Sequence, residues 1–129
     1  MDAAKLQKFV DRCWDDEIVP TLVTDGDVVE SMRKLCEQVG KVPYGAVGAG
    51  TVYGDRNGLV KVVGETRYGE LLGGHIVGAK ATELIQELVN ARALEGGYPE
   101  VARLVHGHPT MSEAIMEAAR AADGWLIHG

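Results

Sequence analysis

The sequence has few of the residues that mark disulfide-rich, metal-binding or redox-active small proteins. Only two cysteines, Cys13 and Cys36, occur among its 129 residues. They lack the close spacing of a redox pair or of a zinc knuckle. Both fall at apolar positions of predicted helices, where a reduced thiol packs as a small hydrophobic side chain. We therefore expect buried thiols here rather than a disulfide or a cysteine-based metal site.

Runs of positive charge and long apolar runs are also missing. The net charge is −6 and lysine and arginine form no cluster, which argues against nucleic acid or an anionic membrane as a partner. Residues 1–23 carry charges throughout, unlike a secretory signal, and no later apolar stretch is long enough to span a bilayer. With 46% hydrophobic residues, the chain is expected to fold in the cytoplasm around a genuine core.

The spacing of the apolar residues changes along the chain. Helical spacing predicts helices over residues 3–15 and 28–39, and Gly40 is expected to end the second. A short strand is predicted over Lys41–Ala46. The glycine-rich passage Gly45–Gly54 carries few core residues and is predicted as a loop.

The remaining residues predict a hairpin followed by helices. Leu59–Val63 and Leu71–Val77 have the composition of two strands joined by a somewhat long turn. Helices are predicted to begin at Ala81, Pro99 and Met111, the last with a face of small residues. This order of elements predicts an α+β fold, in which a short antiparallel sheet has helices packed on one face.

The segment from His106 to Glu113 is the one stretch suited to proton chemistry. Thr110 and Glu113 have the spacing of a capping box, in which each side chain accepts a hydrogen bond from the other's backbone N–H. Side chains in the first turn of a helix lean toward its N-terminus, so Glu113 also points toward His108. A hydrogen bond between them would fix the imidazole tautomer and stabilise the imidazolium, as a general acid–base requires. A cap is the more ordinary interpretation, and it does not exclude the pair.

Two other candidate sites have weaker support. His106 and His108 would share a face of an extended segment and bind a metal there. A third ligand would have to be Glu113 or His75, and a histidine inside a strand more often has a structural role. Gly48–Gly54 superficially resembles a dinucleotide-binding glycine loop, but its third glycine falls one residue late and no helix is predicted to follow. The sequence therefore predicts neither a cofactor-binding nor a metal-binding site in this chain.

Four segments match one protein family in the family's own order: Gly58–Val63, Tyr68–Gly78, Ala81–Glu87 and His106–Glu113. Through them the chain resembles the C-terminal interface domain of flavin-dependent pyridine nucleotide–disulfide oxidoreductases, most closely that of dihydrolipoamide dehydrogenase. The core of the last segment is shared with glutathione reductase, so the substrate within the disulfide class stays open.

The resemblance divides the chain in two. Residues 1–38 are expected to be a helical N-terminal segment of different origin, and residues 39–129 a disulfide-reductase-type dimerisation domain that folds as one unit with it. Residues 4–23 resemble the leader of zinc-dependent dipeptidases, but none of that family's metal-binding motifs follows.

The resemblance also implies functional roles. In this family the domain joins two subunits, which implies a homodimer, and His108 would exchange a proton with a substrate thiol in the partner's active site while Glu113 orients it. The family's FAD-binding and NAD-binding regions and its redox cysteines have no counterpart in this sequence. The leading hypothesis is therefore a stand-alone dimerisation domain without redox activity of its own. The alternatives are a piece that supplies the His–Glu pair in trans to a flavoprotein, and a small-ligand or metal-binding module that uses His106 and His108.

Overall fold

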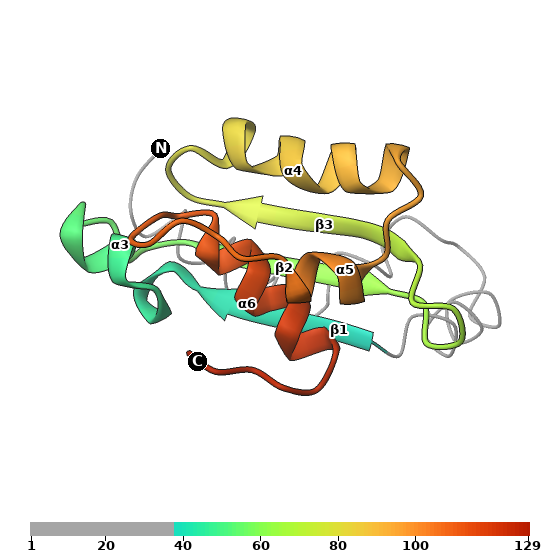
Figure 1. Cartoon of the computed structure of the whole chain (residues 1–129). Coiled ribbons are helices and arrows are strands. Elements are labelled where there is room, and N and C mark those ends of the chain that lie inside the picture. The colour runs from blue at the N-terminus through green and yellow to red at the C-terminus, as the bar shows by residue number, and fades with distance from the viewer. Residues whose placement is uncertain (1–37) are drawn as a thin grey trace, which may run out of the picture. The chain divides into compact units, whose positions relative to one another are not determined.

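A computed structural model of the chain describes residues 38–129 (Figure 1). The helix predicted over residues 3–15, all but the last two residues of the helix predicted over residues 28–39, and both cysteines lie outside the described residues. The division at residue 38 and the separate origin of the N-terminal segment therefore stay predictions.

Three strands form one antiparallel sheet in the order β1-β2-β3. They are β1 (Gln38–Pro43), β2 (Leu59–Gly64) and β3 (Leu71–Val77), so the predicted hairpin is confirmed. The first strand begins and ends three residues earlier than the strand predicted over Lys41–Ala46. Its register places Gln38 opposite Gly64 and Val39 opposite Val63, and the prediction that a helix extends to Val39 is therefore wrong.

Gly40 explains why the helix prediction failed at that end. A Cβ atom at Gly40 would lie 1.8 Å from the carbonyl oxygen of Ala118, in the helix that crosses β1. The glycine therefore allows a helix to pack directly on the strand, whereas the sequence pattern suggested that it ends one. The small-residue face predicted for the last helix supplies the other half of this close contact.

The prediction of a loop over Gly45–Gly54 is also wrong. It contains a 3-10 turn, η2 (Tyr44–Ala46), and a short helix, α3 (Gly48–Val52). The cause lies in packing that the local sequence does not reveal. Tyr44 is fully buried, and its hydroxyl donates a hydrogen bond to the Ala79 carbonyl at 3.0 Å. Gly50 packs so closely on the Tyr44 backbone that a Cβ there would lie 2.1 Å from its carbonyl oxygen.

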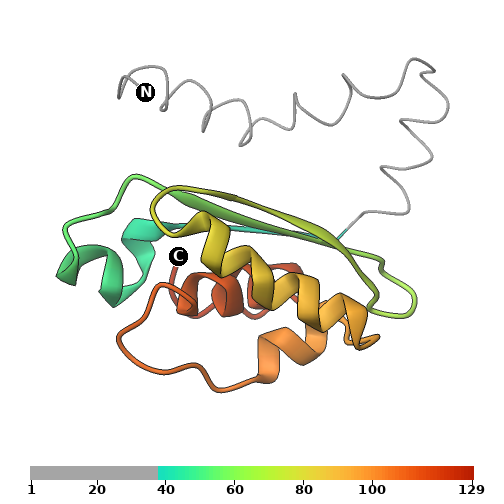
Figure 2. The same ribbon diagram turned by 90° about the horizontal axis from the view of Figure 1, so that it is seen from above.

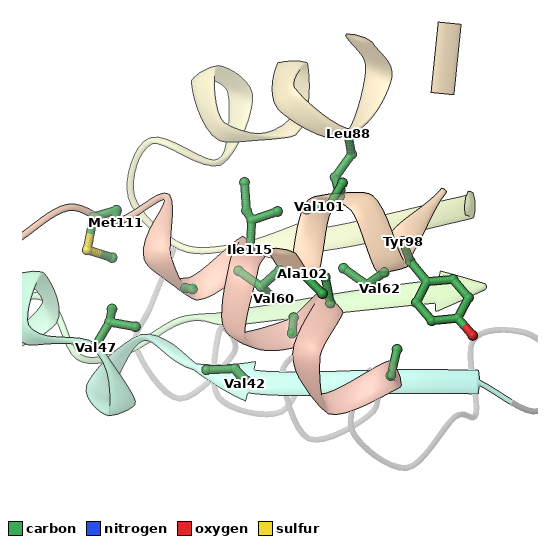
Figure 3. Close-up of a cluster of buried hydrophobic side chains, with 14 of the residues drawn as sticks. Val42, Val47, Val60, Val62, Leu88, Tyr98, Val101, Ala102, Met111 and Ile115 are labelled. Atoms are coloured by element: carbon green, nitrogen blue, oxygen red, sulfur yellow. The ribbon is translucent and has the colours of Figure 1, made fainter. Parts of the chain in front are cut away.

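Helices cover one face of the sheet, as predicted (Figure 2). They are α4 (Ala81–Ala93), α5 (Tyr98–Arg103) and α6 (Glu113–Ala122). Helix α6 packs on β1 and β2, while α4 packs on β3. The core between the helices and the sheet is built mainly of valine, leucine, isoleucine and alanine side chains (Figure 3), among them Val42, Val60, Val62, Leu88, Val101 and Ile115. No helix within residues 38–129 has the length and apolar character that crossing a membrane requires.

Candidate functional site

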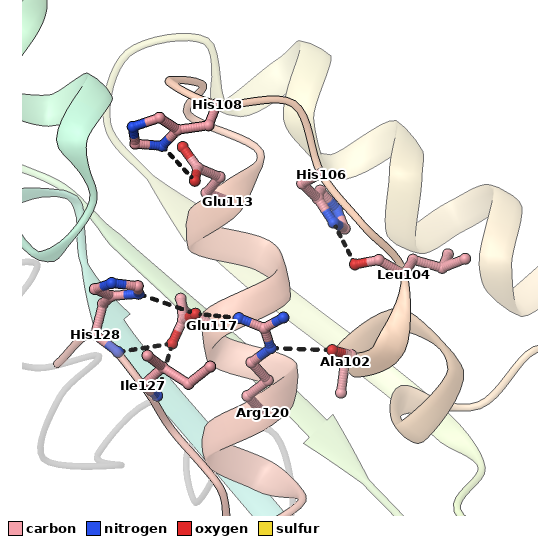
Figure 4. A network of polar contacts seen from close by, with 9 residues as sticks. All are labelled: Ala102, Leu104, His106, His108, Glu113, Glu117, Arg120, Ile127 and His128. Atoms are coloured by element: carbon pink, nitrogen blue, oxygen red, sulfur yellow. Dashed lines mark hydrogen bonds and ion pairs between the residues drawn. The ribbon is translucent and has the colours of Figure 1, made fainter.

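The predicted His–Glu contact is present at the start of α6 (Figure 4). The His108 ring nitrogen Nδ1 lies 2.9 Å from Oε1 of Glu113. Because a carboxylate only accepts hydrogen bonds, the geometry assigns the proton to Nδ1 and leaves Nε2 with a free lone pair. His108 precedes the helix across a cis peptide bond to Pro109. Beside the ring lies Gly48 of α3, where a Cβ would approach Cε1 of His108 to 3.3 Å.

The capping interaction predicted for Glu113 is present in part. Its second oxygen, Oε2, accepts a hydrogen bond from the Thr110 backbone N–H at 2.9 Å. The Thr110 hydroxyl does not complete a reciprocal box, because it donates to the Gly107 carbonyl at 2.6 Å and lies 2.9 Å from the Ser112 hydroxyl. One carboxylate therefore both binds the Thr110 backbone just before the helix and holds the imidazole, using a different oxygen for each.

The two side chains of the pair differ in their exposure to solvent. The His108 side chain is 73% exposed, whereas that of Glu113 is 14% exposed. Burial raises the pKa of Glu113, but the hydrogen bonds from Thr110 and His108 outweigh it and hold that pKa below its ordinary value. Glu113 is therefore an anion at neutral pH. An anchored carboxylate behind an exposed imidazole is suited to stabilise the imidazolium that forms when Nε2 takes a proton from a group outside the chain.

His106 does not join His108 at this site. Its Nε2 lies 2.7 Å from Oε1 of Glu87 in α4, and its Nδ1 lies 3.1 Å from the Leu104 carbonyl oxygen. Both ring nitrogens are thus engaged by protein acceptors, which leaves none to coordinate a metal. His75 lies in β3, in register with Lys61 of β2. Within residues 38–129 there is no group of three histidine, cysteine or acidic side chains that could hold a metal ion.

Helix α6 carries a second carboxylate site, at Glu117, which the sequence patterns did not predict. Glu117 is fully buried, and its carboxylate accepts hydrogen bonds from the Arg120 guanidinium at 2.6 Å and from two backbone N–H groups of the C-terminal tail (Figure 4). These donors belong to Ile127 at 3.0 Å and His128 at 2.9 Å. Arg120 also donates to the Ala102 carbonyl of α5 at 3.1 Å. Glu117 thereby anchors the backbone of the C-terminal tail at His128.

Glu117 is charged despite its burial. Burial raises its pKa, but the two backbone N–H donors, Arg120 and His128 together lower it below the ordinary value. One signal in the sequence points to this site. Glu117 lies on the apolar face of α6 between Ala114 and Ala118, and it has an arginine three residues later as a possible ion-pair partner.

The glycine-rich segment Gly48–Gly54 does not fold as a dinucleotide-binding loop. A classic dinucleotide-binding glycine loop joins a strand to a helix within a parallel βαβ unit. All three strands of residues 38–129 are antiparallel, and Gly48 and Gly50 lie within the short helix α3, where Gly50 serves close packing. These residues therefore do not form the cradle that the family uses for FAD or NAD.

Comparison with known proteins identifies the architecture around this site. The family described as "Pyridine nucleotide-disulphide oxidoreductase, dimerisation domain" matches residues 24–119. A dihydrolipoyl dehydrogenase of Bacillus subtilis is 44% identical over 91 residues, which cover 70% of this chain and 19% of that protein. A dihydrolipoyl dehydrogenase of Haloferax volcanii is 39% identical over 114 residues, which cover 88% of this chain and 24% of that protein.

Solved structures share the same fold. LpdA from Mycobacterium tuberculosis superposes with a TM-score of 0.60 at 28% identity, covering 64% of this chain and 18% of that one. The flavoprotein disulfide reductase RclA from Escherichia coli gives a TM-score of 0.63 over 70% of this chain and 21% of its own, and at 20% identity it supports the fold alone. The chain spans only about a fifth to a quarter of the length of these relatives.

Proposed function

Because the chain belongs to the pyridine nucleotide–disulphide oxidoreductase dimerisation-domain family, we propose that it is a self-associating module that forms homodimers and has no redox activity of its own. The match of most of the chain to a domain whose described role is dimerisation carries this proposal. The proposed location is the cytoplasm, where cysteines stay reduced, and the net charge of −6 argues against nucleic acid and membranes as partners.

Exposed apolar side chains suggest where the module self-associates. Directly after α5, Leu104 is 58% exposed and Val105 is 97% exposed. Two consecutive large apolar side chains in water are unfavourable unless a partner covers them. A symmetric dimer would bury this pair on both copies at once, since the same surface patch faces itself in a two-fold interface.

Sedimentation velocity over a wide concentration range tests the dimer. Val105→Glu should raise the dimer dissociation constant by at least about tenfold, because the interface would then contain a buried like-charge pair. Val52→Glu is the matched control, since it makes the same exchange at another exposed apolar position, on α3. A strict monomer at high concentration, or equal effects of both variants, would contradict the proposal.

A second candidate function is supported by the exposure of His108. In this proposal the chain complements a flavoprotein that lacks the domain, and the FAD, the NAD site and the redox disulfide all belong to that partner. Nε2 of His108 takes the proton of a substrate thiol, and the resulting thiolate attacks the partner's disulfide. Glu113, hydrogen-bonded to Nδ1, stabilises the imidazolium until the proton is returned.

Complementation in solution tests this second candidate. The chain is mixed with a dihydrolipoyl dehydrogenase truncated before its dimerisation domain, and dithiol oxidation is followed through NAD reduction. Recovered activity with the unmodified chain and none with His108→Gln would support the role in trans. An intact complex without any recovered activity would eliminate it and leave the dimerisation module as the function.

A further inference from the structure

His106 is held between two hydrogen-bond acceptors. The Leu104 carbonyl faces Nδ1 at 3.1 Å, and the Glu87 carboxylate faces Nε2 at 2.7 Å. A neutral imidazole has one N–H and can satisfy only one of these acceptors, whereas the imidazolium satisfies both. The His106 side chain itself is only 8% exposed, so these two contacts account for most of its polar surroundings. The geometry therefore favours the doubly protonated ring.

This ring joins two elements that the sequence separates by 19 residues. Glu87 lies in α4, while His106 belongs to the segment between α5 and α6. Nearby side chains point into solvent: Val105, directly before His106, is 97% exposed, and His108, two residues after it, is 73% exposed. The buried His106 ring is therefore an anchor in a stretch that is otherwise turned outward, two residues before the candidate acid–base.

We propose that His106 is a positioning residue: its imidazolium ties the segment before α6 to Glu87 of α4 and thereby determines where His108 lies relative to Glu113. This inference deepens the second proposed function, since a displaced His108 ring would lose the carboxylate that supports it. The charge of His106 would then affect the position of His108, because losing one proton removes one of the two hydrogen bonds that hold the His106 ring.

The charges around His106 support an anchor that depends on pH. The hydrogen bond to Glu87 raises the pKa of His106, and this effect outweighs burial and the positive charge of Arg120 in α6, both of which lower it. Glu87 and Arg120 are the charged groups that face the ring from the two helices packed around it. The anchor should therefore be complete at acidic pH and weaken as the pH rises through the raised pKa.

Two-dimensional NMR of the whole chain tests the proposal without any partner protein. The ring signals of His106 and His108 and the backbone amide of Thr110, which is bonded to Glu113, are followed between about pH 5 and pH 9. We expect the Thr110 amide to show a step at the His106 midpoint, separate from any step that follows His108. In Glu87→Gln the His106 midpoint should fall, because the hydrogen bond that raises its pKa is lost, and the Thr110 step should move with it.

Glu83→Gln is the matched control, because it removes the same charge from an exposed position of α4. It should move neither the His106 midpoint nor the Thr110 step. A Thr110 curve without a step at the His106 midpoint in the unmodified chain would overturn the proposal, even if Glu87→Gln failed to fold. A Thr110 curve that stays unchanged while the His106 midpoint moves would overturn it as well. Since none of these signals requires a dimer or a flavoprotein, failure of the proposed functions would be seen separately.

Discussion

Helix α6 carries two carboxylates one turn apart that do opposite things. Both Glu113 and Glu117 have a lowered pKa and both accept backbone N–H groups, so their protonation alone does not distinguish them. The remaining hydrogen-bond donors to each carboxylate distinguish the two residues. Glu117 is bonded at 2.6 Å to Arg120, which is always charged, and to two backbone N–H groups of the C-terminal tail, while the exposed His128 ring lies farther away at 3.4 Å. Within residues 38–129, Glu113 has no such permanent cation, and its nearest side-chain partner is the exposed ring of His108 at 2.9 Å. The donors of Glu117 are those of a carboxylate that stabilises the fold, whereas the proposed role of Glu113 is to support an exposed imidazole in proton transfer.

Removing the buried carboxylate should have the largest effect. Glu117→Ala leaves the Arg120 guanidinium and the N–H groups of Ile127 and His128 without their acceptor, so we expect the free energy of unfolding to fall by about 3 kcal/mol. Urea unfolding measures this loss. Glu83→Ala, an exposed position of α4, is the control. Similar losses in the two variants would show that the Glu117 network contributes little.

Acid should weaken both carboxylate sites in the same direction. A carboxyl group with a lowered pKa in the folded state contributes stability that is complete above its unfolded pKa and is lost as the pH falls through the folded value. With an ordinary value of 4.5, the contributions of Glu113 and Glu117 should therefore decline below about pH 4.5. Urea unfolding at stepwise lower pH measures the decline. Replacing both residues by glutamine should flatten it, and an unchanged slope would contradict the assignment.

Much of the fold could be predicted because its signals are local. The hairpin of β2 and β3 follows from two apolar runs separated by turn residues, and α4 follows from the helical spacing that ends at Gly96-Gly97. The segment Tyr44–Val52 could not be predicted because its helical turns depend on Tyr44 packing against glycines and a carbonyl far along the chain. The glycine-rich composition of this segment predicts a loop, whereas tertiary packing holds it in helical turns.

In the candidate site, too, the contact between residues close in the sequence could be predicted and the contact between distant residues could not. His108 and Glu113 are five residues apart, so the spacing at a helix start was enough to predict their hydrogen bond, while the acid–base role stays a prediction. The partner of His106 lies 19 residues away on another helix, and no periodicity of the sequence connects the two. Contacts of that kind become visible only when the packing of the helices is known.

Removing the carboxylate at the start of α6 should have a smaller effect than removing the buried one. Glu113→Ala deletes the acceptor of the Thr110 N–H at a helix start, which costs about 1 kcal/mol of unfolding free energy. Glu113→Gln keeps an acceptor oxygen and should recover most of that loss. Hydrogen exchange of the Thr110 amide gives a local measure, with faster exchange expected in the alanine variant alone. Equal exchange in both variants would mean that Glu113 does not cap this helix.

Removing the exposed imidazole should have the smallest effect on stability and the clearest effect on function. His108 is 73% exposed, and Glu113 keeps its bond to Thr110 when the ring is gone, so His108→Gln should change the unfolding free energy by less than about 0.5 kcal/mol. The same variant should abolish dithiol oxidation when mixed with the truncated flavoprotein, because no base then accepts the thiol proton. A large loss of stability would make His108 structural, like Glu117, and the contrast between the two ends of α6 would then be wrong.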